Sequence, residues 1–336
     1  HGAWIDGIRV HDSTRRPSGT TGLRGNVEIE RAGTIALVGR PNAGKSTLLN
    51  EILGEKISII SSKPQTTRNR VVGILSQPPA QIVLVDTPGI HKSRTRMNQA
   101  MVKVAVDALA DVDGVCWVVD AIKAVDALES GRAVINRGRD HIAKLIEQAG
   151  DVPVTIALNK VDRCNKRKLL PVMAALGGRL PGAELVPVSA LRGEGVTNLV
   201  ELWAKQVPEG PAMFPEDQIM DGSERFVVAE LIREKVFRLT EQEVPYSTAV
   251  HVEKFDESQR DEETARVTIY ATIVVERPSQ KGIVIGKGGS MLKHIGTKAR
   301  MDIQRLLGCR VHLDLHVKVK DKWTTNPRSL REIGLE

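Results

Sequence analysis

The segment "GRPNAGKS" constrains the fold of this chain more than any other stretch. It runs from Gly39 to Ser46 and matches G-x-x-x-x-G-K-[ST], the pattern of a phosphate-binding loop. The apolar run "TIALVG" precedes it, and the helical pattern "KSTLLNEILG" follows it. In such a loop, backbone N–H groups and a helix N-terminus surround the phosphate oxygens. The chain is therefore expected to contain a parallel sheet with a phosphate site at its carboxyl edge.

Apolar strand candidates alternate with helix candidates from about residue 33 to residue 204. The strand runs are "TIALVG", "QIVLVD", "GVCWVVD", "VTIALN" and "ELVPVS", and the helices between them include "RMNQAMVKVAVDALADV" and "GVTNLVELWAKQV". This alternation predicts βαβ units, in an α/β domain whose mostly parallel sheet has helices on both faces. A proline-rich stretch at 207–222, "VPEGPAMFPEDQIMDG", is expected to be a linker.

Three shorter motifs follow the phosphate loop, each at the carboxyl end of a predicted strand. "DTPG", Asp86–Gly89, offers an acid to the Mg²⁺ shell and an amide to the γ-phosphate, although alone it is only a turn sequence. "NKVD", Asn159–Asp162, offers a carboxylate to two N–H groups of guanine, which adenine lacks. "SAL", Ser189–Leu191, offers a backbone amide to the guanine oxygen. Together with the phosphate loop, these motifs predict a site that selects GTP.

The predicted nucleotide-binding residues come from these four motifs. They are Gly39, Arg40, Pro41, Asn42, Ala43, Gly44, Lys45, Ser46, Thr47, Asp86, Thr87, Pro88, Gly89, Ile90, Asn159, Lys160, Val161, Asp162, Ser189, Ala190 and Leu191. We expect Lys45 to reach the β- and γ-phosphates, and Ser46 and Asp86 to hold Mg²⁺. In "SSKPQTTRNR", Thr67, with Thr66 as second choice, is expected to complete the metal shell while the γ-phosphate is present.

The C-terminal third of the chain has a different pattern. A helical stretch, "RFVVAELIREKVFRLT", precedes two alternating strands, a glycine loop, a helix over about 289–307 and a last strand, "RVHLDLHVKVK". This order, α-β-β-α-β, predicts a smaller α+β domain. From Lys281 onward, twelve Lys/Arg accompany five Asp/Glu, which accounts for the whole net charge of +7. Such a basic segment indicates a polyanionic partner, either nucleic acid or an anionic membrane surface.

The glycine loop of this region, "IGKGGS", lacks the spacing of a second nucleotide loop. Its core, Gly286–Gly289, fits the G-x-x-G turn that joins two helices in KH domains and lets a sugar–phosphate backbone approach. The predicted RNA-binding residues are Lys281, Ile285, Gly286, Lys287, Gly288, Gly289 and Lys293, with Lys298, Arg300 and Arg305 as further phosphate contacts. We expect Ile273, Val275, Ile283 and Ile285 to form the wall of a groove for the bases. Because aromatic residues make up only 3% of the chain, base-edge hydrogen bonds should dominate the readout.

Seven stretches occur in the order that is typical of one family. They are "GRPNAGKSTLLN", "KPQTTR", "DTPGIHK", "NKVD", "FPEDQIMDGSERF", "VPYSTAVHVEKF" and "VIGKGG". On these residues the chain resembles the Era GTPases, over about 33–336. The resemblance implies a G domain at 31–206, a linker at 207–225 and a type II KH domain at 226–336. It also implies binding of single-stranded RNA near the 3′ end of the small-subunit (16S) ribosomal RNA, and a role in 30S subunit biogenesis. The stretch 122–150 is longer and more basic than is usual in the family.

The residue after the "DTPG" motif bears on the rate of hydrolysis. Many GTPases carry there a glutamine that orients the attacking water, but this chain has Ile90, as Era-like GTPases do, and His91 is expected in a solvated loop. Intrinsic hydrolysis should therefore be slow, and a partner or an ion should raise it. Asn42 either braces the phosphate loop or, as in related GTPases, helps to hold K⁺. The predicted catalytic residues are Lys45, Thr67 and Asn42.

The N-terminal segment, the cysteines and the length of the apolar runs indicate the class of protein. Residues 1–30 show no sustained periodicity and are expected to be a disordered extension. Because the chain begins at His1, we expect it to be trimmed or incomplete. Cys116 and Cys309 read as core residues and Cys164 as a loop thiol, a usage typical of a reducing compartment. No apolar run approaches the roughly 18 residues that a membrane span needs.

These observations predict a cytoplasmic, monomeric GTPase whose nucleotide state regulates binding to ribosomal RNA and the 30S subunit. Mg²⁺ and K⁺ are the expected ions, with GTP as substrate and GDP as product. Two alternatives stay open. One is an assembly factor that needs bound GTP but for which hydrolysis is incidental. The other is a peripheral switch at the inner face of the cell membrane, which would use the basic C-terminal region as its contact.

Overall fold

The computed structural model describes residues 28–61, 63–91, 95–260, 265–332 and 335. It also describes two short strands, β1 (Trp4–Ile5) and β2 (Ile8–Arg9), which pair in antiparallel fashion. Apart from these two strands, residues 1–27 lie outside the described part of the chain. The disordered extension that we expect at 1–30 therefore stays a prediction. None of the helices in the described part combines the length and apolarity that are needed to cross a bilayer.

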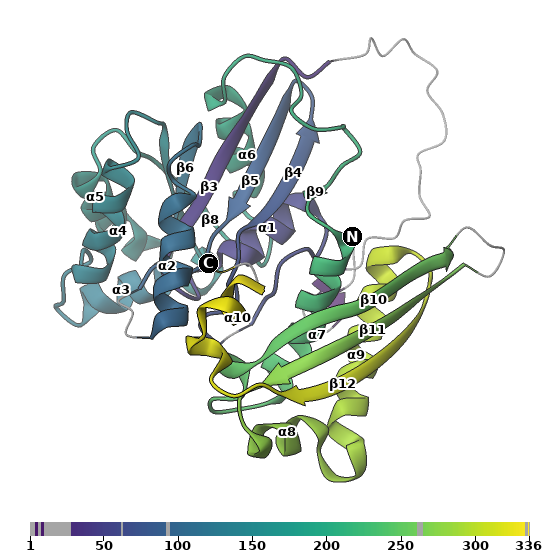
Figure 1. The fold of residues 1–336 in the computed structure, drawn as a ribbon. Coiled ribbons are helices and arrows are strands. Elements are labelled where there is room, and N and C mark those ends of the chain that lie inside the picture. The colour runs from purple at the N-terminus through teal and green to yellow at the C-terminus, as the bar shows by residue number, and fades with distance from the viewer. Residues whose placement is uncertain are drawn as a thin grey trace.

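A seven-stranded sheet forms the N-terminal part of the molecule (Figure 1), in the order β8-β7-β6-β3-β5-β4-β9. Its strands are β3 (Arg31–Gly39), β4 (Val71–Gln77), β5 (Ala80–Asp86), β6 (Gly114–Asp120), β7 (Val154–Asn159), β8 (Glu184–Val188) and β9 (Met220–Asp221). Strands β8, β7, β6, β3 and β5 are parallel, whereas β4 and β9 are antiparallel to their neighbours. The mostly parallel sheet confirms the prediction. Its antiparallel edge was not expected, and β9 comes from the predicted linker.

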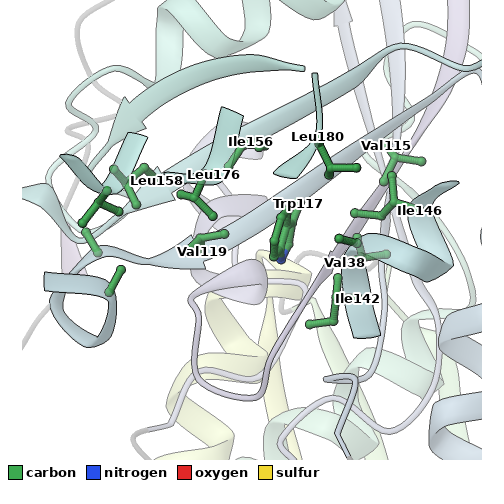
Figure 2. Packing of buried hydrophobic residues seen from close by; sticks show 14 of the residues in the cluster. Val38, Val115, Trp117, Val119, Ile142, Ile146, Ile156, Leu158, Leu176 and Leu180 are labelled. Atoms are coloured by element: carbon green, nitrogen blue, oxygen red, sulfur yellow. The ribbon is translucent and has the colours of Figure 1, made fainter. Parts of the chain in front are cut away.

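Helices cover both faces of this sheet because successive strand residues point to opposite sides. The helices are α1 (Lys45–Leu53), α2 (Arg96–Asp107), α3 (Ala121–Glu129), α4 (Arg137–Glu147), α5 (Leu169–Arg179) and α6 (Val196–Gln206). On one face, Trp117 of β6 packs with Val38, Ile142 of α4 and Ile146 (Figure 2). On the other face, the neighbouring Cys116 belongs to the core under α1 and α6. Strand β6, in the middle of the sheet, is thereby buried on both sides.

The C-terminal part forms a second, three-stranded sheet in the order β10-β11-β12. Its elements are α7 (Glu224–Leu239), β10 (Ala249–Gln259), β11 (Arg266–Val275), α8 (Pro278–Ile285), α9 (Ser290–Leu307), β12 (Arg310–Val319) and α10 (Pro327–Glu332). Strands β10 and β11 are antiparallel, and β11 and β12 are parallel. A single core joins the sheet to α7 and α9, and Cys309 packs against it as expected.

The predicted order α-β-β-α-β omits two helices. The run "GIVI" belongs to α8, and α10 follows β12, so that the order is α-β-β-α-α-β-α. Pro278 stands in the first turn of α8, and the Gln280 side chain accepts hydrogen bonds from the N–H groups of Glu276 and Arg277, at 2.9 and 3.1 Å. Both features favour a helix start. They outweigh the preference of the β-branched residues for a strand.

Candidate nucleotide site and nucleic-acid interface

The phosphate loop joins β3 to α1, as its sequence predicts. Gly44 has a φ of 101°, and a Cβ there would lie 2.2 Å from Nδ2 of Asn159, so that no other residue fits. Lys45 and Ser46 follow in the first turn of α1, and both are buried. The Lys45 ammonium lies 3.5 Å from the carbonyl oxygens of Gly39 and Arg40. The loop therefore packs against Asn159 and holds the Lys45 ammonium beside its own carbonyl groups.

The three predicted metal ligands meet beside this loop. The Ser46 hydroxyl lies 2.6 Å from Oδ2 of Asp86 and 2.8 Å from the Thr67 hydroxyl, which is itself 3.3 Å from Asp86 Oδ2. Ser58, which the sequence did not single out, donates to the same oxygen at 2.9 Å. Oδ1 of Asp86 is buried and has no hydrogen-bond partner among the described residues. A cluster of oxygens with one orphaned carboxylate atom fits Mg²⁺.

Burial sets the charge balance of this cluster. It raises the pKa of Asp86, although Lys45 and the hydroxyls oppose the shift. Burial also lowers the pKa of Lys45, and Asp86 opposes that shift in turn. Each charge is thus poorly solvated without its partner. A bound metal and polyphosphate would supply the missing counter-charges.

The "NKVD" motif is tied to both the phosphate loop and the "SAL" motif. Asn159 donates to the Ala43 carbonyl at 2.9 Å and accepts from the Ala190 N–H at 3.0 Å. Lys160 donates to the Asn42 carbonyl at 2.7 Å. Asp162 accepts from the Ser189 hydroxyl at 2.7 Å. The three segments therefore form one continuous wall.

Sequence reasoning missed Asp120, which ends β6. Its carboxylate accepts from the Lys160 ammonium at 2.8 Å and from the Lys123 N–H, at the start of α3, at 3.2 Å. An acid at the carboxyl end of a parallel strand was the available signal. Asp120 thereby fixes Lys160 of the "NKVD" motif.

A cavity of about 360 Å³ lies over these residues. Its lining includes Lys45, Ser46, Thr67, Gly89 and Lys160. The phosphate loop, the Thr67 segment and the "DTPG" motif thus share one hollow. Its size is in the range of small-molecule sites.

Two residues, Ile90 and His91, follow the "DTPG" motif, and Ile90 has no polar side-chain group to offer to the cavity. Ile90 is buried in the core, and its N–H donates to the Gly39 carbonyl at 3.0 Å. The expectation of a solvated loop at His91 is wrong, because the ring is half-buried. Its Nδ1 lies 2.8 Å from the Gly89 carbonyl oxygen and its Nε2 lies 3.2 Å from Nε2 of Gln65. His91 therefore contacts the segment that carries Thr67.

The second glycine loop lies between α8 and α9 and is open to solvent. Gly288 has a φ of 59°, and nothing would lie within 4 Å of a Cβ there. Lys287 and Lys293 are exposed, and Lys281 is half-buried. None of these lysine ammonium groups has a hydrogen-bond or ion-pair partner in the part of the chain that the structure describes. Three unpaired cations around an open glycine turn fit a polyanion.

The predicted groove wall needs a correction. Ile273 and Val275 of β11 are fully buried and belong to the core with α7 and α9. Ile283 on α8 is 49% exposed, and Ile285 is partly buried. Alternation along β11 turns its odd-numbered residues inward. The apolar surface beside the loop is therefore provided by α8.

The segment that carries Thr67 is bound directly to the C-terminal region. Arg68, next in sequence, is 4% exposed and donates to the carbonyl oxygens of Thr248, Pro245 and Tyr246, at 2.6, 3.1 and 2.9 Å. Its guanidinium also lies over the Trp323 ring, 5.9 Å from the centroid. Burial and the nearby Arg233 lower the pKa of Arg68 to about 9. A position next to a predicted metal ligand is thus fixed by the other half of the molecule.

Further contacts extend this connection on both sides of Thr67. Lys63 donates to the Phe237 carbonyl at 2.7 Å, Arg238 donates to the Ile60 carbonyl at 2.8 Å, and Arg233 donates to the Thr66 carbonyl. Helix α2, which follows the "DTPG" motif, packs with Trp323 and the residues around α10 (Figure 1). The segment that carries Thr67 and the helix that follows the "DTPG" motif therefore both rest on the C-terminal region.

Comparisons with known proteins agree with this geometry. A family model described as "50S ribosome-binding GTPase" matches residues 34–160, and one described as "KH domain" matches residues 243–324. The chain is 49% identical to the GTPase Era of Geobacter metallireducens over 304 residues, which cover 90% of this chain and 97% of the relative. It is 47% identical to the GTPase Era of Nitratidesulfovibrio vulgaris over 310 residues, 91% of this chain and 97% of the relative.

Solved structures give the same result. A point variant of Aquifex aeolicus Era bound to GDP·AlF4⁻ has a TM-score of 0.83 at 36% identity. Era in complex with MgGDPNP and nucleotides 1506–1542 of 16S ribosomal RNA has a TM-score of 0.83 at 37% identity. Each match covers 91% of this chain and 99% of the other.

Proposed function

The chain belongs to the Era family of GTPases, and on that premise we propose that it couples GTP hydrolysis to binding of 16S ribosomal RNA during 30S subunit biogenesis. The domain limits that we propose are 31–206 for the G domain, 207–225 for the linker and 226–336 for the KH domain. The protein is a GTPase, and the KH region is the part that meets RNA. The observation that carries the proposal is the direct bonding of the Thr67 segment to the KH region through Arg68.

The nucleotide site acts by positioning and charge. Lys45 neutralises the β- and γ-phosphates, and Ser46, Thr67 and Asp86 hold Mg²⁺. Mg²⁺ held by these three residues would supply positive charge beside the terminal phosphoryl group. Asp162 accepts from the guanine N–H groups, which excludes ATP because adenine would leave that carboxylate unpaired. The amide of Gly89 meets the γ-phosphate.

Hydrolysis without a partner is slow in this proposal. Ile90 has no polar group with which to orient water, so that the remaining acceleration comes from charge at the phosphate loop. Asn42 holds K⁺ there, with GTP hydrolysis faster in K⁺ than in Na⁺ at matched ionic strength. Equal rates in the two salts, together with an Asn42→Ala variant that matches wild type, would remove the ion from the account.

The GTP state controls RNA binding through the segment around Thr67. Thr67 reaches the metal only while the γ-phosphate is present. The neighbouring Arg68 is held by three carbonyl groups of the KH region, so that a change at Thr67 must either move that region or break these bonds. The free energy of γ-phosphate binding is in this way shared with RNA binding.

We propose that the protein is a cytoplasmic monomer and that its partner is the 3′ end of the small-subunit ribosomal RNA. Binding of a fluorescent single-stranded RNA of that sequence tests this, with a scrambled RNA and anionic vesicles as comparisons. Preference for the matching RNA supports the assignment. Binding to vesicles but to neither RNA would replace it with a membrane switch, and full rescue of cells by a variant that binds GTP without cleaving it would make hydrolysis incidental.

A further inference from the structure

A second cavity adjoins the nucleotide site on the side of the phosphate loop that faces α3 and α4. Its volume is about 420 Å³. Arg40, Lys123 and Arg139 line it together with Asp120 and Trp117, and we call it the arginine cavity. It shares Lys123 and residues of the phosphate loop with the nucleotide cavity, so that the two hollows are neighbours. No role described above uses Arg139 or the arginine cavity.

The charge in the arginine cavity is not balanced. Arg139 is 4% exposed, and one of its terminal nitrogens donates to the Val134 carbonyl, which carries no net charge. Arg40 and Lys123 are exposed at the rim, and their side chains have no hydrogen-bond or ion-pair partner within the described ranges. Asp120 is the one carboxylate in the lining, and it is already paired with Lys160 at 2.8 Å. Three cations therefore face a hollow without a counter-ion.

The fold brings these cations together and keeps them in place. A Cβ at Gly138, in the first turn of α4, would lie 3.5 Å from Cζ of Arg40, so that this turn lies directly against the phosphate loop. Asn136 caps α4 by accepting from the N–H groups of Gly138 and Arg139, both at 3.1 Å. Burial and then the charge of Arg40 lower the pKa of Arg139, while Asp120 opposes this. Like charges held close in a hollow favour an anion between them.

Trp117 and α4 form the rigid floor of the arginine cavity. Trp117 is 1% exposed and packs with Ile142 of α4 in the sheet core (Figure 2). Helix α4, which carries Arg139, lies in the stretch 122–150. Lys123 and Arg139 both come from this stretch.

We propose that the arginine cavity binds inorganic phosphate and is the first station of the γ-phosphate after its cleavage from GTP. This rests on the proposed function, because GTP hydrolysis supplies the phosphate next to the cavity. A tetrahedral oxyanion accepts charge-assisted hydrogen bonds from guanidinium and ammonium groups. Lys123 lines both hollows, so that the released phosphate passes from one to the other without losing a cationic partner.

The equilibrium test fills the γ-phosphate position first. Protein loaded with Mg²⁺ and a non-hydrolysable GTP analogue is titrated with inorganic phosphate in a calorimeter, so that binding cannot occur at the γ position. Wild type, Arg139→Gln, Lys123→Ala and Lys103→Ala are compared, since Lys103 is an exposed lysine of α2 outside both cavities. We expect saturable binding that weakens at least about tenfold in the first two variants and is unchanged in the third.

Two controls distinguish a folding defect in Arg139→Gln from loss of the phosphate site. The Arg139→Lys variant keeps the charge, and the melting temperatures of both variants are compared with that of wild type. Arg139→Lys should retain more phosphate affinity than Arg139→Gln at equal melting temperature. No saturable binding in the loaded wild type overturns the proposal, as does binding that Arg139→Gln leaves intact. Absence of GTP cleavage by the wild-type protein would instead contradict the proposed function.

A single-turnover experiment identifies the source of the phosphate. GTP cleavage is followed by quenching, and free phosphate is followed with a fluorescent phosphate sensor. We expect release to lag behind cleavage in wild type and the lag to shorten at least about threefold in Arg139→Gln, whose residue lines only the arginine cavity, in proportion to the weakened binding. If titration shows a site but release shows no lag, the cavity takes phosphate from solution, and the claim about the product is overturned.

Discussion

The two glycine loops of this protein have opposite surroundings, although both use positive φ angles. A side chain at Gly44 would collide with Asn159, whereas a side chain at Gly288 would meet nothing. Lys45 is buried opposite Asp86, whereas Lys287 is exposed without a partner in the described structure. The first loop is enclosed by the protein and suits a small ligand of fixed length. The second leaves its space to the ligand and suits a polymer that continues past it.

Arg68 ties the surroundings of the first loop to the region that carries the second. It lies one residue from Thr67 and is bonded to the segment that precedes β10. If the two loops have separate ligands and are connected through Arg68 and the contacts around it, changes at each loop should have separable effects. The following changes test this separation.

The largest effect is expected from Lys45→Ala. Removing this buried cation should lower kcat/KM for GTP by about 10²–10³-fold, since a preorganised charge no longer stabilises the transition state. RNA affinity of the nucleotide-free protein should stay at the wild-type value. Steady-state phosphate production measures kcat/KM, and the fluorescence anisotropy of a labelled RNA measures RNA affinity. Lys205→Ala on α6 is the control. Equal loss of both activities would show that the loops are not separable.

The reverse change is the double variant Lys287→Asp, Gly288→Asp. It replaces a cation and an open turn by two anions, and should weaken RNA binding at least about 100-fold, or ~2.7 kcal/mol. GTP hydrolysis in the absence of RNA should be unchanged, because neither residue lines the nucleotide cavity. Lys205→Asp controls for the added negative charge. A fall in RNA-free hydrolysis would contradict the separation.

Arg68→Lys acts on the link and leaves both loops intact. A lysine keeps the charge but cannot donate to three carbonyl groups with the fixed geometry of a guanidinium. The ratio of RNA affinities in the GTP-analogue and GDP states should fall to within about twofold, from about tenfold in wild type. Stability should fall by about 1–3 kcal/mol as buried carbonyls lose their donors. Urea denaturation of the GTP-analogue and GDP states measures the loss of stability, and RNA titration of the same two states measures the affinity ratio. An unchanged affinity ratio would dismiss Arg68 as the link.

The smallest effect concerns the ionic contact between Lys56, near α1, and Asp302 on α9, whose charged atoms lie 2.9 Å apart. Burial raises the pKa of Asp302, but hydrogen bonds from Lys235 and Lys56 outweigh it and leave the pKa below its ordinary value of 3.8. A carboxylate with a depressed folded pKa stabilises the fold above the unfolded pKa, and this is lost as pH falls through the folded pKa. Asp302→Asn should therefore lower the free energy of unfolding by about 1–2 kcal/mol at pH 7.

The pH profile distinguishes this carboxylate from a packing effect. The stability difference between wild type and Asp302→Asn should persist from pH 7 to about pH 4 and disappear below the ordinary value of 3.8, as the wild-type carboxyl takes up its proton. Denaturant midpoints at several pH values measure it. If the stability difference stays constant down to about pH 2.5, the loss comes from altered packing and not from the charge of Asp302.

The sequence was enough to single out Ser46, Thr67 and Asp86, whose side chains lie together in the structure, but not the link through Arg68. Asp86 ends β5 and Ser46 stands in the first turn of the helix that follows β3, and the parallel pairing of β3 and β5 brings these two positions to one edge of the sheet. The "GIVI" run was ambiguous because four apolar residues suit a strand or a short helix, and only the start at Pro278 favours the helix. Arg68 gave no signal, because its carbonyl partners lie about 180 positions further along the chain.

Arg139 was invisible for a related reason. An arginine in a helical stretch is ordinarily on a solvated face, and the cavity beside it depends on the packing of α4 against β6 and the phosphate loop. Pairwise side-chain contacts between distant elements follow from the fold and not from local pattern. The features that sequence did not reveal are therefore those that connect one element to another.

The most direct test of the central claim is a thermodynamic cycle on wild type. RNA affinity is measured with a non-hydrolysable GTP analogue and with GDP, and the affinity for each nucleotide is measured with and without RNA. The account predicts tighter RNA binding in the analogue state by about tenfold, and the same factor in the reverse direction, because coupling between sites is reciprocal. Equal RNA affinity in both nucleotide states would show that the two loops act independently, and the link through Arg68 would then have no role in function.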